Sequence, residues 1–130
     1  MSKLIISTSN SPKAIGPYSQ AINIKGGITY TSGQIPLDPK TGNLVSDNFD
    51  EQVIQTLKNL QGILIERNCK LSNIIKLTVY LIDLSNFNRL NTIFENFFDK
   101  DSYPARSVVE VSKLPKDSQI EIEAIFYDEG

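Results

Sequence analysis

The feature that most constrains this chain is the order in which two hydrophobic periods alternate along it. Apolar residues from Phe49 to Leu64 recur at spacings of four, four, three and four, which predicts an amphipathic helix over about 49–67. A second, shorter helix is predicted over about 86–98. Segments rich in branched residues predict strands at 4–8, 21–24, 28–32, 75–82, 107–111 and 119–127.

Both predicted helices have recognisable starts. Asn48, with Glu51 three residues later, resembles a capping box for the first helix. Ser85 is predicted to cap the second. The apolar stripe of that second helix is predicted to consist of Phe87, Leu90, Phe94 and Phe97 or Phe98.

The resulting order, β-β-β-α-β-α-β-β, predicts an α+β fold with one mixed sheet and two helices on one face. A chain of 130 residues suits a single domain over 1–130. Two helices cover only one face, and period-two alternation leaves apolar residues on the other: Tyr80, Ile82, Ile125 and Tyr127. An uncovered apolar sheet face favours a homo-oligomer, with scattered exposed residues as the alternative.

The rarest residues exclude several kinds of chemistry. The sequence has no histidine, which excludes Ser-His-Asp triads, Cys-His dyads and histidine zinc sites. Its single cysteine, Cys69, excludes an internal disulfide and is interpreted as a packing residue. Dinucleotide and Walker-type glycine motifs are absent. The usual phosphate-binding and metal-binding motifs are therefore missing from the sequence.

The net charge and the hydropathy of the chain limit the kinds of partner that are expected. Thirteen basic and 15 acidic residues give a formal net charge of −2, which disfavours nucleic acid as the main partner. The apolar runs are far shorter than the ~20 residues that cross a bilayer. The first residues also lack a signal-peptide core, so a cytoplasmic protein without membrane contact is expected.

Arg106 is the most prominent candidate for a functional residue. It lies at the start of a largely apolar predicted strand. A guanidinium fixed there offers a planar, bidentate fork for a carboxylate. That carboxylate belongs either to a substrate or to a structural ion pair with Glu110, Glu121 or Glu123, and the residues alone favour the ion pair.

Other candidates are weaker by themselves. A partly buried Glu121 can act as a general base, although an exposed rim residue is the simpler interpretation. Tyr18 follows a Gly-Pro bend that can direct its ring into a cleft, and a surface or interface tyrosine fits equally well. Ser32 and Gly33 lie where a predicted strand meets a loop, a common place for ligand groups, but turn chemistry alone explains them.

Four stretches together carry a resemblance to a known family. They are 14–20 (AIGPYSQ), 31–36 (TSGQIP), 103–107 (YPARS), and 114–117 (LPKD) leading into 120–124 (IEIEA). In this order and spacing they resemble the RidA family of reactive intermediate deaminases, also called YjgF. The resemblance extends over nearly the whole chain, and the last two stretches are specific only in combination.

The resemblance implies a chorismate-mutase-like subunit and a homotrimer with three clefts between subunits. The implied activity is hydrolysis of 2-imino acids and their enamines, such as 2-iminobutanoate and 2-iminopropanoate. The products would be 2-oxo acids and ammonia, and the resemblance implies no cofactor or metal. The chain is thus expected to be a 2-iminobutanoate/2-iminopropanoate deaminase.

The resemblance also assigns roles by position. Arg106 matches the arginine that clamps the substrate carboxylate, and Glu121 matches the glutamate that holds the attacking water. Positions matching substrate-binding residues of the cleft are Tyr18, Ser32, Gly33 and Asn91.

One position departs from the family pattern. The usual Pro-Ala-Arg-Ser-Cys ends in Val108 here, which excludes thiol chemistry at this point. Val108 shares strand parity with Arg106, so we expect it to line the substrate pocket and make it more apolar.

Two other functions are compatible with these residues. A non-catalytic trimer that binds small carboxylates or regulates other proteins would have the same cleft. A ribonuclease or translation inhibitor is disfavoured by the net charge of −2 and by the absence of histidine.

Overall fold

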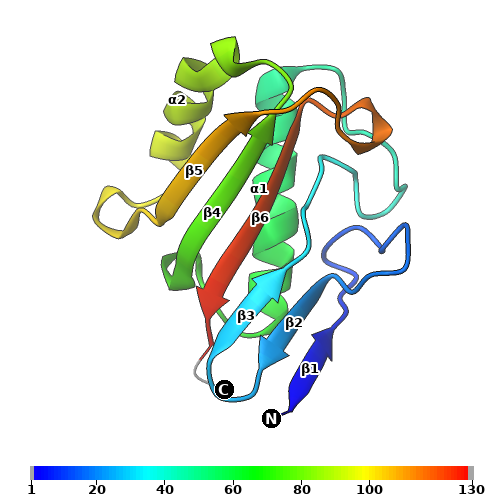
Figure 1. Ribbon diagram of the computed structural model, residues 1–130, viewed down its shortest axis with the longest axis vertical. Helices are drawn as coiled ribbons and strands as arrows, with labels where there is room; N and C mark the ends of the chain where they lie inside the picture. The colour runs from blue at the N-terminus through cyan, green and yellow to red at the C-terminus, as the bar shows by residue number, and fades with distance from the viewer. Residues whose placement is uncertain (1, 129–130) are drawn as a thin grey trace.

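A computed structural model describes residues 2–128; residues 1, 129 and 130, which the predicted domain includes, lie outside the described part. The described residues form six strands and two α-helices in the predicted order (Figure 1). Their bounds are β1 (Lys3–Ile6), β2 (Ala21–Ile24), β3 (Ile28–Thr31), α1 (Phe49–Glu66), β4 (Ile74–Leu81), α2 (Phe87–Phe97), β5 (Ala105–Glu110) and β6 (Ile120–Tyr127). None of the helices within this range has the length and apolar character to cross a membrane.

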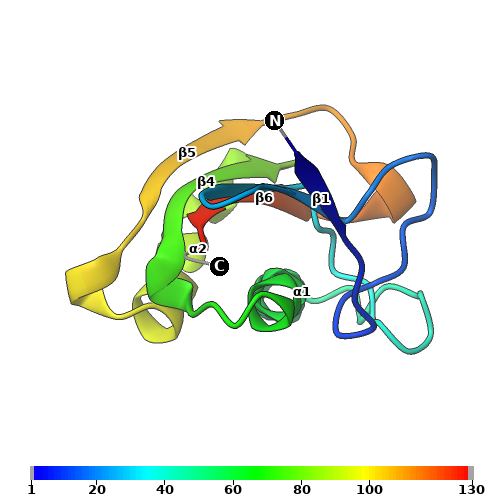
Figure 2. The same cartoon turned by 90° about the horizontal axis from the view of Figure 1, so that it is seen from below.

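The strands form one mixed sheet in the order β1-β2-β3-β6-β4-β5. Most neighbours are antiparallel, but β4 and β5 pair in parallel. A parallel pair needs a crossover connection, and α2 supplies it here. Both α1 and α2 lie on the same side of the sheet (Figure 2). The predicted α+β class, with helices on one face only, is confirmed.

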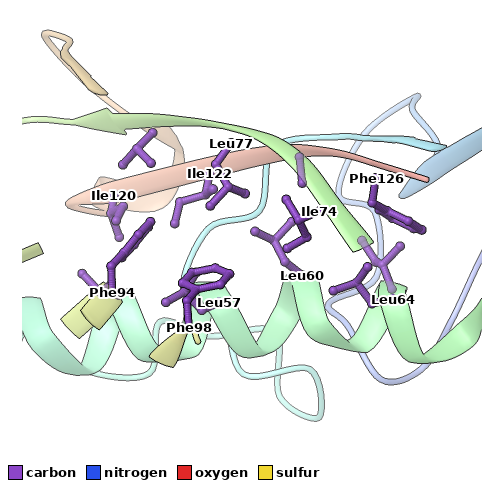
Figure 3. Packing of buried hydrophobic residues seen from close by; sticks show 14 of the residues in the cluster. Leu57, Leu60, Leu64, Ile74, Leu77, Phe94, Phe98, Ile120, Ile122 and Phe126 are labelled. Carbon is purple, nitrogen blue, oxygen red and sulfur yellow. The ribbon is translucent and has the colours of Figure 1, made fainter. Parts of the chain in front are cut away.

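The hydrophobic core lies between the helices and this face of the sheet (Figure 3). On α1, the side chains of Leu57, Leu60 and Leu64 are each no more than 2% exposed. They pack with alternate residues of β6, among them the fully buried Ile122 and Phe126. The apolar side of α1, which repeats every 3.6 residues, therefore packs against the apolar side of β6, which repeats every two residues, in a single layer.

The opposite face of the sheet is covered by neither of the two described helices. On β6, the half-buried Glu121, Glu123 and Ile125 alternate with the core residues, as predicted. Large apolar side chains also remain exposed on this sheet, including Tyr127 at 40% and Val109 at 44%. We call this surface the open face.

The two helices begin differently. Asn48 caps α1 as predicted, because its side chain accepts a hydrogen bond of 2.9 Å from the backbone N–H of Glu51. The predicted cap at Ser85 is wrong. The side chain of Asp83 instead accepts from the backbone N–H of Ser85 at 3.0 Å, and this closes a short 3-10 turn, Leu84–Asn86, before α2 begins.

The loop that carries Tyr18 is fixed against α1. Ser11 Oγ donates to the backbone oxygen of Asn59 at 2.5 Å. The buried Gln20 amide donates to the backbone oxygen of Pro12 at 2.8 Å. Gly62 makes this close approach possible, since a Cβ there would overlap with the backbone of Asn10 and the hydroxyl of Ser11.

We therefore predict that Gly62→Ala destabilises the protein. Alanine favours helix over glycine by about 1 kcal/mol. The overlap should outweigh this and lower the free energy of unfolding by about 1–3 kcal/mol, as overpacking does. Urea unfolding at matched protein concentration measures the change. Gln61→Ala, on the same helical turn, is the control and should stay within about 0.5 kcal/mol of the original. An unchanged or raised midpoint for Gly62→Ala would contradict this packing.

Candidate active site

The predicted site residues form two clusters on opposite faces of the sheet. Arg106 of β5 is in register with Leu77 of β4, a core residue with 0% exposure, so Arg106 points to the helix face. Glu121 of β6 is in register with Tyr80 of β4, one of the residues that alternate with the core, so Glu121 points to the open face. Within one chain the two groups are thus separated by the sheet.

On the helix face, Arg106 is held by α2. Its Nη2 donates to Asn91 Oδ1 at 2.8 Å. Its guanidinium carbon lies 5.4 Å from the ring centre of Phe87 and 5.1 Å from that of Phe94, within the range of cation–π attraction. Burial lowers the pKa of Arg106, but guanidinium stays protonated at neutral pH. One amide and two rings therefore fix the orientation of a cation.

Arg106 has no carboxylate partner among residues 2–128. The ion pairs in this part of the chain join Arg67 to Asp128 and Arg89 to Asp50. The structural ion pair that the residues alone favoured for Arg106 is therefore not formed within the described chain. The guanidinium keeps donor groups with which to bind an external carboxylate.

Arg106 borders a shallow depression of about 250 Å³. The lining residues are Asn91, Phe94, Glu95, Tyr103, Pro104 and Arg106. Val108 lies on the same face of β5 and packs against the hydrophobic core. The wall beside the cation is thus mainly aromatic and apolar.

On the open face, Glu121 borders a second depression, of about 280 Å³. The residues that line it are Ile15, Tyr18, Ser32, Gly33, Ile35, Pro115 and Glu121. Burial, and secondarily the charge of Glu123, raise the pKa of the Glu121 carboxyl. A carboxylate with a raised pKa is a stronger base than an ordinary glutamate.

Backbone pairing brings Ser32 and Gly33 beside Glu121. Gln34 and Ile122 exchange two backbone hydrogen bonds of 2.8 and 3.0 Å, so the segment after β3 runs along β6. Ser32 Oγ donates to the backbone oxygen of Ser19 at 2.5 Å, which ties it to the Tyr18 loop. The backbone of Gly33 then lies so close to Glu121 that a Cβ would overlap with the carboxylate.

These two clusters supply one fixed cation and one basic carboxylate. A cation of this kind binds an anionic group such as a carboxylate, and the glutamate can take a proton from water. Residues 2–128 contain no group of three or more acidic or cysteine side chains that could hold a metal ion. Arg106 and Glu121 can thus supply anion binding and proton transfer.

Some residues at these clusters were not singled out as site residues by the sequence. Phe87 was assigned to an apolar stripe, yet it is 38% exposed and lies against Arg106. A signal was present, because Asn91 shares its helix face through spacings of four and three with Phe87 and Phe94. The hydrogen bond from Tyr80 Oη to Glu123 Oε1, of 2.8 Å, depends on strand register and had no local signal.

Comparisons with known proteins identify relatives over nearly the whole chain. The sequence profile of the family described as Endoribonuclease L-PSP matches residues 8–127. A protein of Homo sapiens named 2-iminobutanoate/2-iminopropanoate deaminase is 48% identical over 121 residues, covering 93% of this chain and 87% of that protein.

Solved structures have the same fold. A Rid family protein of Yersinia pestis, YyfA, gives a TM-score of 0.91 at 44% identity, covering 96% of this chain and 98% of that one. TdcF of Escherichia coli, solved with bound serine, gives a TM-score of 0.88 at 41% identity, covering 95% of this chain and 97% of that one. The chain belongs to the Rid family, also called YjgF or RutC.

The contact between Gly33 and Glu121 yields a prediction. In Gly33→Ala the new methyl group should displace the Glu121 carboxylate in a crystal structure. The clashing atoms end a flexible side chain, so the free energy of unfolding should change by less than about 1 kcal/mol. Gly27→Ala, whose Cβ would meet only the Ile24 backbone oxygen at 3.9 Å, is the control. A carboxylate that stays in place would show that Gly33 does not determine its position.

Proposed function

We propose that this protein hydrolyses 2-imino acids and their enamines, including 2-iminobutanoate and 2-iminopropanoate, to 2-oxo acids and ammonia. The observation that carries the proposal is the Arg106 guanidinium, which is fixed by Asn91 and two phenylalanine rings while lacking a carboxylate partner among the described residues. Such a group suits the carboxylate of an imino acid. The human relative, at 48% identity, has the name of this activity.

The separation of the two clusters supports a site formed between copies of the chain. Arg106 and Asn91 would come from one subunit, and Tyr18, Ser32, Gly33 and Glu121 from a second. The open face bears exposed apolar side chains that a second copy would cover, among them Tyr127 and Val109. We propose a homotrimer with three such sites, as the family resemblance implies.

The proposed reaction divides between the two clusters. Arg106 binds the substrate carboxylate through two parallel hydrogen bonds and orients the imine carbon. Glu121 takes a proton from water as its oxygen bonds to that carbon. That proton passes to nitrogen, which gives an intermediate with a hydroxyl and an amino group on the same carbon. The hydroxyl proton then moves to nitrogen as well, through Glu121, so that the carbon–nitrogen bond breaks, ammonia leaves and the carbonyl forms. Because an imine carbon is already electrophilic, orientation and one base can suffice.

The depression beside Arg106 is small, at about 250 Å³, and its walls are largely apolar. Phe94 and Tyr103 supply apolar surface beside Arg106. We propose short-chain imino acids as substrates; Val108, which was expected to line the pocket, packs against the core and is not among the residues that line this depression.

The alternative functions have less support. A trimer that only binds small carboxylates needs Arg106 but gives no reason for a basic carboxylate at Glu121. The family description names an endoribonuclease, yet the sequence has no histidine and a net charge of −2. Neither feature suits phosphate recognition and cleavage of RNA.

Arg106→Ala tests the proposed clamp. We expect kcat/KM to fall about tenfold or more, because a charge-assisted contact to the substrate carboxylate is lost. The assay generates 2-iminobutanoate with a threonine dehydratase, traps it with semicarbazide, and measures flux diverted to 2-oxobutanoate. Arg89→Ala is the matched control, since Arg89 also lies over a phenylalanine ring, that of Phe49, but is paired with Asp50.

The outcomes separate the candidate functions. Acceleration by the original protein and by Arg89→Ala, but not by a folded Arg106→Ala, supports the deaminase. Normal kinetics in Arg106→Ala would contradict the clamp. If the original protein accelerates nothing yet binds 2-oxobutanoate through Arg106 in calorimetry, the protein is a carboxylate-binding module.

A further inference from the structure

Two carboxylates lie side by side on the open face, and only one has been given a role. Glu121 and Glu123 are two residues apart on β6 and point to the same side, which separates their Cα atoms by about 6.6 Å. Tyr80 of β4 is directly opposite Glu121, while Thr78 is directly opposite Glu123. The hydrogen bond from Tyr80 Oη to Glu123 Oε1, at 2.8 Å, is therefore diagonal. It draws the Glu123 carboxylate toward the strand position of Glu121.

The hydrogen bond also keeps Tyr80 protonated. The bond to Glu123 is the first cause that raises the pKa of Tyr80, followed by burial and the charges of Glu123 and Glu121. Tyr80 therefore stays protonated and remains a hydrogen-bond donor at neutral and acidic pH.

Few other charged groups face Glu121 from the elements around it. On β4 the open-face ionisable residues are Tyr80 and Lys76, and Lys76 lies opposite Ile125, further along β6. The open-face residues of β5 are Ala105, Ser107 and Val109, which carry no charge. The loop side contributes Tyr18, and the Pro115 turn adds Lys116 and Asp117, both exposed.

We propose that Glu123, held by Tyr80, is a positioning residue that strengthens Glu121 as the base of the reaction. This inference rests on the proposed function for its catalytic consequence, but its electrostatic part does not. A second negative charge beside Glu121 disfavours loss of the proton from its carboxyl. Tyr80 keeps that charge in place, so the effect is built into the pairing of β4 with β6.

Glu123 acts on the pH dependence of the reaction through the pKa of Glu121. Glu121 must be ionised to accept a proton from water, so activity falls below its pKa. Neutralising Glu123 lowers that pKa, and the acid limb of kcat/KM moves to lower pH. With the Cα separation of about 6.6 Å taken as the scale of the distance between the two charges, a shift of about 0.5 to 1 pH unit is expected.

The experiment compares Glu123→Gln and Tyr80→Phe with the original protein. Carbon NMR of labelled glutamate carboxyls follows the titration of Glu121, which Glu121→Gln assigns, and pH profiles of kcat/KM are recorded in parallel. Glu123→Gln should shift both to lower pH. Tyr80→Phe should shift both in the same direction by less, because the charge remains but is no longer held near Glu121. Glu66→Gln, an exposed residue at the end of α1, is the equal-charge control and should shift neither.

The outcomes distinguish this inference from the proposed function. An unchanged Glu121 titration in Glu123→Gln overturns the inference, whatever the activity. A uniform loss of activity without movement of the pH profile also overturns it, since that indicates a structural role only. If the original protein has no turnover but the Glu121 titration shifts, the proposed function fails and the electrostatic coupling stands.

Discussion

The pairing of β4 with β6 is the constraint on which the rest of the molecule depends. Its register directs Leu77, Val79 and Ile122 into the core with no exposed surface, and Tyr80 and Glu121 to the open face. The same pairing fixes the environment of the basic carboxylate. Because a slip of one residue would exchange the two faces, the buried core also maintains the register of the polar groups. Stability and site geometry are thus determined together.

The fold was largely predictable because its signals are local. The helix predicted over about 49–67 is α1, Phe49–Glu66, and its cap at Asn48 is correct. Ser85 was assigned wrongly because a competing side chain, Asp83, lies two residues earlier and closes a turn of its own. Side-chain types also identified Arg106 and Glu121 as candidates, since each is a charged residue in a largely apolar strand.

The arrangement of the site could not be predicted in the same way. The alternation of β6 places Glu121 on the open face, but β5 is less regular, so the face of Arg106 follows from its pairing with Leu77 of β4. For that reason the ion pair considered for Arg106 is absent from the described chain, and its actual partners are Asn91, Phe87 and Phe94. The proposed activity is supported by the family resemblance and by the names of relatives. The structure itself shows a cation suited to binding an anion, Arg106, and a basic carboxylate, Glu121.

In the proposed trimer, Arg106 and Glu121 act together from different copies of the chain. The most direct test mixes two inactive variants, Arg106→Ala and Glu121→Gln, by unfolding and refolding them together at equal amounts. If each site takes its arginine from one subunit and its glutamate from another, random assortment restores about a quarter of the original activity. No recovery, in a sample whose mixed trimers are verified by mass spectrometry, would contradict a site shared between copies.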